Sequence, residues 1–141
     1  MPKRSASAEW QGGLKGGKGT MNVTRANFQA PYTFPSRFEE GQGLSPEDMI
    51  AAAHAGCFSM ALSGALEKAG HTPESVRTTA TVNLEPVNGA PTINRIDLET
   101  TAKVPNLDAG EFQRIAEEAK TNCPISRLLK AAEIRLSAKL A

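Results

Sequence analysis

The sequence has little of several residue types that mark specialised classes of protein. Of its 141 residues, two are cysteines, two are histidines and 5% are aromatic. There is no Cys-x-x-Cys pair and no second histidine-bearing cluster, which argues against a structural zinc site. The net charge is only +1 and the lysines and arginines are scattered, so we expect no nucleic-acid partner.

Long apolar runs are missing as well. The first four residues lead into serine, alanine and glutamate, so we expect no secretory signal. The longest uncharged run, residues 49–66, is rich in small residues and contains His54 and two serines. A membrane span needs about 20 strongly apolar residues, so we interpret this run as a buried helix of a soluble cytoplasmic protein without a membrane partner. Thiols in the cytoplasm are normally reduced, and a disulfide that forms there is usually transient and catalytic or sensing.

What is present fits one globular domain over residues 1–141, with 40% apolar and 22% charged residues. We expect three short strands in the N-terminal third, over residues 5–10, 20–24 and 33–38. A long helix follows, because Ser45 is a good N-cap, Pro46 suits the first helical position and two acids lie in the first turn. Gly70 is expected to end this helix.

The C-terminal half alternates between apolar and polar residues in three segments. These expected strands cover residues 76–84, 96–104 and 134–140. Asn88 and Gly89 mark a hairpin between the first two, and helices over residues 108–121 and 124–130 precede the third. The order β-β-β-α-β-β-α-α-β predicts an α+β fold with antiparallel sheets around a long central helix.

Residues 49–62 of the long helix carry no charge on any face. A helix that is apolar all round is buried all round, and one sheet covers only one side of it. We therefore expect a homodimer of intertwined subunits, with this helix near the interface.

Each cysteine allows a structural and a chemical interpretation. Cys57 lies in an alanine-rich helical stretch, where a cysteine is most often a small hydrophobic residue. Cys123 precedes Pro124 at an expected helix start, where exposed N–H groups stabilise a thiolate, although many unreactive residues also fit there. Arg37 and Glu47 on their own are an ordinary surface arginine and a first-turn acid. Together, the guanidinium could lower the pKa of a buried thiol while the carboxylate fixes its direction.

Three other motifs give weaker evidence of a function. His54 and Cys57 share a helix face and could bind zinc with Cys123, but no further histidine is near. Residues 12–20 resemble a phosphate-binding loop, but glycine stands where serine or threonine is needed and no helix follows. Neither serine in residues 49–66 lies in a Gly-x-Ser-x-Gly elbow, which argues against serine hydrolysis.

Two segments together resemble a known family. Residues 44–62, LSPEDMIAAAHAGCFSMAL, closely resemble the signature of the osmotically inducible protein C branch of the OsmC/Ohr superfamily. Residues 122–126, NCPIS, resemble the second cysteine motif of that superfamily. The resemblance extends over nearly the whole chain and implies an OsmC-like fold and an intertwined homodimer with active sites at the subunit interface.

The resemblance also implies an activity. The protein would be a thiol-dependent peroxidase for organic hydroperoxides, and more weakly for hydrogen peroxide, that protects against oxidative and osmotic stress. Cys57 would be the peroxidatic thiol, Cys123 the resolving thiol, Arg37 the group that activates the thiolate, and Glu47 the acid that orients Arg37. No metal or organic cofactor is implied, and an external dithiol, such as a lipoylated protein, would be the reductant. Apolar side chains would wall the pocket, with Phe58, Met60, Ile125 and Leu128 as candidates.

Two alternatives stay open at this point. The chain could be a non-catalytic binding module for a small apolar ligand, with both thiols as packing groups. It could also be a hydrolase-like thiol enzyme that uses Cys57 with His54. The peroxidase interpretation gives His54 no chemical role.

Overall fold

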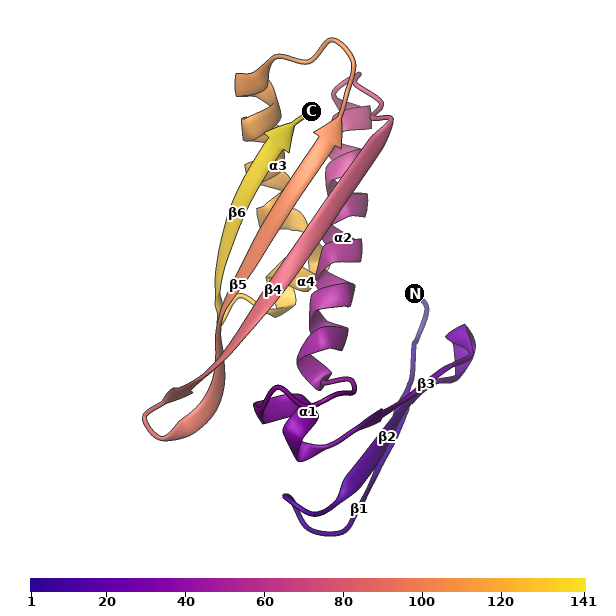
Figure 1. Cartoon of the computed structure of the whole chain (residues 1–141). Helices are drawn as coiled ribbons and strands as arrows, with labels where there is room; N and C mark the ends of the chain where they lie inside the picture. Colours follow the sequence, from indigo (N-terminus) through magenta and orange to yellow (C-terminus); the bar gives the residue numbers. More distant parts are fainter. The chain divides into compact units, whose positions relative to one another are not determined.

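The computed structural model describes all residues from Met1 to Ala141, and they form two compact units (Figure 1). The first unit is Met1–Met49 and the second is Ile50–Ala141. The expectation of a single domain stays a prediction. The α+β class, the sequence of the major elements and the long helix are confirmed.

The first unit holds a three-stranded antiparallel sheet in the order β1-β2-β3. Its strands are β1 (Ser7–Gln11), β2 (Lys18–Val23) and β3 (Phe28–Tyr32), and a 3-10 turn, η1 (Thr24–Ala26), joins the last two. Gly19 lets two aromatic rings close over β2, because a Cβ there would lie 2.6 Å from atoms of both Trp10 and Tyr32. The two rings pack with their centroids 5.3 Å apart.

The expected strand over residues 33–38 is wrong. This segment is a short helix, α1 (Phe34–Phe38), and the third strand lies just before it. Thr33 and Ser36 form a capping box, in which the Thr33 Oγ1 accepts from the Ser36 N–H at 3.2 Å and the Ser36 Oγ accepts from the Thr33 N–H at 2.8 Å. This reciprocal pair satisfies two donors of the first turn, and proline is well tolerated there, so the segment turns into a helix.

The long helix α2 (Pro46–Lys68) begins and ends where the sequence predicts. The Ser45 Oγ accepts from the Asp48 N–H at 3.2 Å, and the Asp48 carboxylate accepts from the Ser45 N–H at 2.8 Å. At the other end Gly70 has φ of +89°, the left-handed conformation that glycine adopts without strain.

The second unit contains a three-stranded sheet in the order β4-β5-β6. Its strands are β4 (Ser75–Val87), β5 (Ala90–Lys103) and β6 (Glu133–Leu140). The predicted Asn88-Gly89 turn joins β4 to β5, and both residues have positive φ, 52° and 80°. That conformation matches the twist of a tight hairpin.

The expectation of antiparallel pairing throughout is wrong for β6, which runs parallel to β5. The connection between them explains this. The helix α3 (Ala109–Asn122) has 14 residues and is therefore about 21 Å long. It carries the chain back along the sheet, and a crossover of this kind brings the next strand in parallel. Asp108 is the N-cap of this helix, and its carboxylate accepts from the Glu111 N–H at 3.1 Å.

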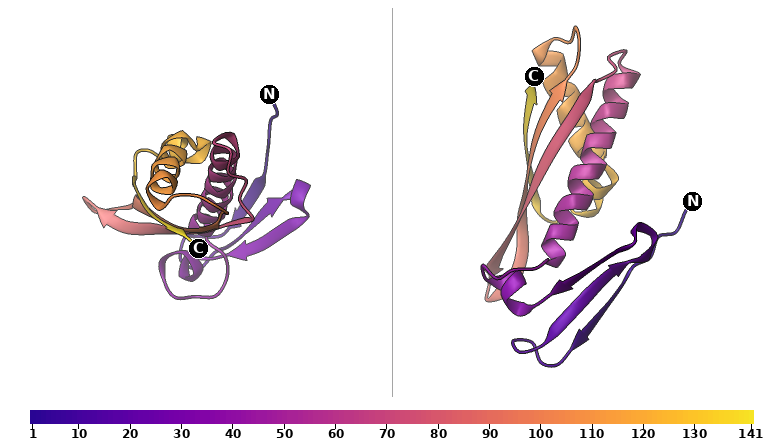
Figure 2. Two further views of the ribbon diagram at one scale, coloured as in Figure 1. Left: turned by 90° about the horizontal axis from the view of Figure 1, so that it is seen from above. Right: turned by 45° about the vertical axis from the view of Figure 1, so that its right-hand side comes forward.

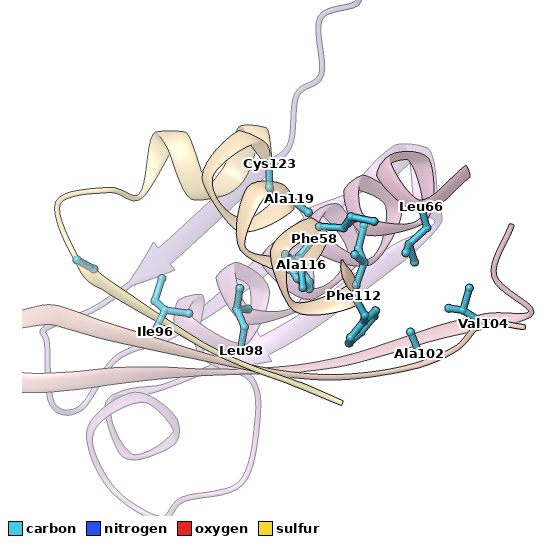
Figure 3. Packing of buried hydrophobic residues seen from close by; sticks show 13 residues of the cluster. Phe58, Leu66, Ile96, Leu98, Ala102, Val104, Phe112, Ala116, Ala119 and Cys123 are labelled. Atoms are coloured by element: carbon cyan, nitrogen blue, oxygen red, sulfur yellow. The ribbon is translucent and has the colours of Figure 1, made fainter. Parts of the chain in front are cut away.

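One face of this sheet is covered by α2 and α3 (Figure 2). Buried apolar side chains from both helices meet the inward face of the strands (Figure 3). The fully buried members with the largest side chains are Phe58, Phe112, Leu62, Leu66, Ile96 and Leu98. A short helix, α4 (Pro124–Leu128), follows α3 at the end of the core that contains Cys123.

The opposite face of α2 is not covered by the chain. Between Met49 and Leu66 its exposed residues are small or apolar, namely Ala52, Ala53, Gly56, Met60 and Gly64, and charged residues are exposed only nearer the two ends of the helix, at Asp48, Glu67 and Lys68. Met60 is 79% exposed. By length and composition alone α2 could span a membrane, but the core helix of a soluble protein meets the same criterion. Its other face contributes to the core, as a helix buried in protein does.

Candidate functional site

The structure brings the two cysteines together. Their Sγ atoms lie 3.0 Å apart although the residues are 66 positions apart in the chain, and both thiols are free. A disulfide has an S–S distance of about 2.05 Å, so bond formation requires the sulfur atoms to approach by only about 1 Å. The pair lies wholly within the second unit.

Local structure aims both sulfur atoms at this point. Cys57 lies midway along α2 and precedes the fully buried Phe58. Cys123 lies at the junction of α3 and α4: its N–H donates to the Ala119 carbonyl at 2.9 Å, and its carbonyl accepts from the Arg127 N–H at 2.9 Å. Because Cys123 serves as the end of one helix and the start of the next, its position is fixed by backbone hydrogen bonds on both sides.

The two thiols have different environments. Burial raises the pKa of Cys57, and the neighbouring Cys123 raises it further, although the Ile125 N–H acts in the opposite direction. Burial also acts to raise the pKa of Cys123, but hydrogen bonds from Cys57 and from the backbone and side chain of Ser126 outweigh it, so the pKa of Cys123 is lowered. Two groups in contact titrate as a pair, so the first proton leaves this pair more readily than the second.

The thiol with the lower pKa is the less accessible of the two. Cys123 has no exposed surface, whereas Cys57 is partly exposed. The more accessible sulfur therefore belongs to Cys57 and the more acidic one to Cys123. The two thiols are therefore not equivalent, because a small molecule from solvent reaches the Cys57 sulfur first.

Arg37 and Glu47 also meet, within the first unit. The Glu47 Oε1 accepts from Arg37 Nη2 at 2.8 Å and from Nε at 3.2 Å, and Oε2 accepts from Nε at 3.3 Å. The Glu47 side chain is 10% exposed and that of Arg37 is 39% exposed. The carboxylate thus holds one edge of the guanidinium, while the Nη1 group donates no hydrogen bond within the chain. An arginine held in this way presents its remaining donors in a fixed direction.

Sequence reasoning missed the contact of His54. This side chain is completely buried, and its Nε2 lies 2.7 Å from the Oγ of Ser126, which is 4% exposed. Burial lowers the pKa of His54, so the ring is neutral near pH 7. The ring bonds Ser126 and makes no hydrogen bond to Cys57, so the geometry does not support a Cys57–His54 hydrolase pair. No local pattern in the sequence signals the contact between His54 and Ser126, because the two residues are 72 positions apart in the chain.

The candidate walls of the pocket divide into two groups. Phe58 is fully buried and Ile125 packs against the core. Met60 and Leu128 are 79% and 74% exposed in the single chain. No group of three or more histidine, cysteine, aspartate or glutamate side chains is arranged to hold a metal ion.

Comparison with known proteins identifies relatives over the whole chain. A family profile described as OsmC-like protein matches residues 39–139. Peroxiredoxin OsmC of Escherichia coli K12 is 46% identical over 138 residues, which cover 97% of this chain and 96% of the relative. The protein of the same name from Shigella flexneri matches with the same identity and coverage.

Solved structures share the fold at much lower identity. An OsmC like protein from Mycoplasma pneumoniae superposes with a TM-score of 0.75 and 16% identity, covering 99% of this chain and 98% of that one. An organic hydroperoxide resistance protein OsmC from Legionella pneumophila gives 0.73 and 21%, covering 99% of both chains. The chain therefore belongs to the OsmC family, and its relationship to curated peroxiredoxins makes it a peroxidase.

Proposed function

We propose that this peroxidase reduces organic hydroperoxides, and more weakly hydrogen peroxide, with its two cysteines acting in sequence. Cys57 attacks the peroxide and Cys123 resolves the oxidised sulfur. The observation that carries this proposal is the 3.0 Å separation of two free, unequal thiols in the core of the second unit.

In the first step the Cys57 thiolate attacks one peroxide oxygen. An S–O bond forms as the O–O bond breaks, the sulfur becomes a sulfenic acid, and the alkoxide takes a proton and leaves as an alcohol. Cys57 is assigned this step because its sulfur is the accessible one of the pair. The apolar residues beside it, Phe58 and Ile125, suit a hydroperoxide with an apolar chain.

This step needs a cation near Cys57. Burial raises the pKa of that thiol, so little thiolate forms without help. We assign this role to Arg37, whose Nη1 donors stay available while Glu47 holds the other edge of the guanidinium. Pairing with Glu47 cancels much of the long-range field of Arg37, so its effect requires direct N–H contact with the sulfur or the peroxide.

In the second step the Cys123 sulfur attacks the Cys57 sulfenic acid and a disulfide forms. An external dithiol, such as a lipoylated protein, then reduces the disulfide by thiol exchange. All of these steps use protein thiols, so the proposed cycle includes no metal or organic cofactor.

The proposed assembly is an intertwined homodimer. The uncovered face of α2 supports it, because the five small or apolar residues exposed there form a flat apolar stripe with Met60 projecting from it. A second copy of the chain would cover this stripe. It would also bury Met60, one of the candidate residues of the pocket wall that is exposed in the single chain. We place the protein in the cytoplasm, where it would protect against oxidative and osmotic stress.

The proposal is tested by stopped-flow measurement of cumene hydroperoxide consumption in the presence of a dithiol. The Cys57→Ser variant should lose turnover completely, because the remaining thiol, that of Cys123, has no exposed surface. A Cys57→Ser protein that consumes the peroxide at the wild-type rate would refute the proposal.

A further inference from the structure

The buried contact between His54 and Ser126 has no part in the peroxidase cycle described so far. His54 lies one turn before Cys57 on α2, and Ser126 lies one turn after Cys123 at the start of α4. Their side chains are 2.7 Å apart, and both are buried with Cys123. Four chemically active side chains thus meet where the two helices pack.

The state of the imidazole follows from its surroundings. His54 is neutral, so only one ring nitrogen carries a hydrogen. The Nδ1 atom is buried without a hydrogen-bond partner. A buried N–H without a partner is rarer than an unpaired acceptor, so the hydrogen belongs on Nε2. In this tautomer Nε2–H donates to the Ser126 Oγ.

This assignment leaves the hydrogen of the Ser126 hydroxyl free for another acceptor. The sulfur of Cys123 is the acceptor at hand, because Cys123 and Ser126 lie one helical turn apart and both are buried. The backbone N–H and the hydroxyl of Ser126 both act to lower the pKa of Cys123. In this arrangement His54 donates to Ser126, and the Ser126 hydroxyl can donate in turn to the Cys123 sulfur. Two donors in series favour negative charge on the final acceptor, because the first hydrogen bond polarises the second.

No charged side chain competes for this sulfur. Residues 49–66 of α2 carry no charge, and the inward-facing residues of β5 are apolar or threonine. On α3, Lys120 is paired with Glu117 at 3.1 Å, and Arg127 on α4 is exposed. The donors of Ser126 are thus the main polar influence on Cys123 apart from Cys57 and the Ile125 N–H.

We propose that Ser126 stabilises the Cys123 thiolate for the resolving step and that His54 is the positioning residue that keeps the Ser126 hydroxyl turned toward the sulfur. The inference rests on the proposed function, because it concerns only the second step of that cycle. There the Cys123 thiolate attacks the Cys57 sulfur, the S–S bond forms as the S–O bond breaks, and the oxygen leaves as hydroxide and takes a proton to become water. The Cys57 sulfur is reduced and the Cys123 sulfur is oxidised, so no further oxidant or reductant is needed.

The experiment separates the two steps in a single turnover. The full-length reduced protein is mixed with one equivalent of cumene hydroperoxide and quenched at intervals. Trapping of the sulfenic acid with dimedone reports the first step, and the disulfide found by mass spectrometry reports the second. The Ser126→Ala variant should slow disulfide formation about tenfold or more, because a hydrogen bond to a charged group is lost, and should change sulfenic acid formation far less.

A matched pair of variants tests His54. His54→Gln carries an N–H near the place of Nε2, whereas His54→Asn carries its N–H near the place of Nδ1. The glutamine variant should resolve at nearly the wild-type rate and the asparagine variant about as slowly as Ser126→Ala. This pair also serves if Ser126→Ala does not fold, and thermal unfolding of both variants controls for loss of structure.

A second readout is the thiolate absorbance at 240 nm in a Cys57→Ser background, where Cys123 is the only thiol. Adding Ser126→Ala should raise the pKa of Cys123, which a purely structural role would not do. Equal disulfide formation rates in wild type, Ser126→Ala and both His54 variants would overturn the inference. Failure of wild-type Cys57 to form a sulfenic acid would instead refute the proposed function itself.

Discussion

The ion pair of the first unit and the thiol pair of the second are assembled in different ways. Arg37 and Glu47 are 10 residues apart, and the capped starts of α1 and α2 bring them together. Cys57 and Cys123 are 66 residues apart and meet only when α2, the sheet and α3 have packed. The ion pair is thus a local structure with exposed donors, whereas the thiol pair depends on the core. We therefore expect changes in the ion pair to alter rates and changes in the core to alter stability.

The largest effect on turnover, after loss of Cys57, should come from removing the other thiol. Cys123→Ser should still undergo the first oxidation, and turnover should then stop because the sulfenic acid has no resolving partner. Stopped-flow traces should show one equivalent of peroxide consumed per chain. Continued turnover with the same dithiol would remove the resolving role from Cys123.

A smaller loss should follow from breaking the ion pair. Arg37→Ala should slow the first oxidation by about 10²-fold or more, since it removes a preorganised donor from the developing charge. Glu47→Gln should slow it by about tenfold, because the neutral amide holds the guanidinium less firmly. Rates of sulfenic acid formation at fixed pH give both values. A Glu47→Gln effect larger than that of Arg37→Ala would contradict the order of roles.

The pH dependence of the first oxidation should show whether Arg37 of the ion pair lowers the pKa of Cys57. Burial raises the pKa of Cys57, and a contact with Arg37 would lower it. A lower pKa gives more thiolate at a given pH, so the wild-type rate should reach its plateau at a lower pH than the rate of Arg37→Ala. Coincident pH profiles would show that Arg37 does not influence the thiol.

The smallest effect on turnover should come from a core residue away from both pairs. Leu66 is fully buried, and Leu66→Ala should lower the free energy of unfolding by about 2–5 kcal/mol. Denaturant unfolding measures this change. Peroxide turnover of the folded variant should stay within about twofold of wild type. A loss as large as that of Arg37→Ala would contradict the expectation that changes in the core alter stability and not the rate.

The sequence was most informative where local signals agree. Ser45, Pro46 and Gly70 predict both ends of α2, and Asn88-Gly89 predicts the hairpin. Residues 33–38 misled because their aromatic residues favour a strand, while the side chains of Thr33 and Ser36 cap a helix. The parallel pairing of β6 depends on how α3 packs against the sheet, which no local pattern records.

In the candidate site, too, some features could be predicted from the sequence and others depend on packing. Motif resemblance picked out both cysteines, and the structure brings their sulfur atoms together. The His54–Ser126 contact was missed because it joins two helices through side chains 72 residues apart, and neither residue is unusual in its own segment. Contacts of this kind follow from packing and become visible only in three dimensions.

The most direct test of the central claim is a count of thiols against peroxide under anaerobic conditions. One equivalent of cumene hydroperoxide per chain should remove both free thiols and yield a Cys57–Cys123 disulfide within one chain, identified by mass spectrometry of the unreduced digest. Two free thiols after the peroxide has been consumed, or a disulfide that joins Cys57 of two chains, would contradict the account.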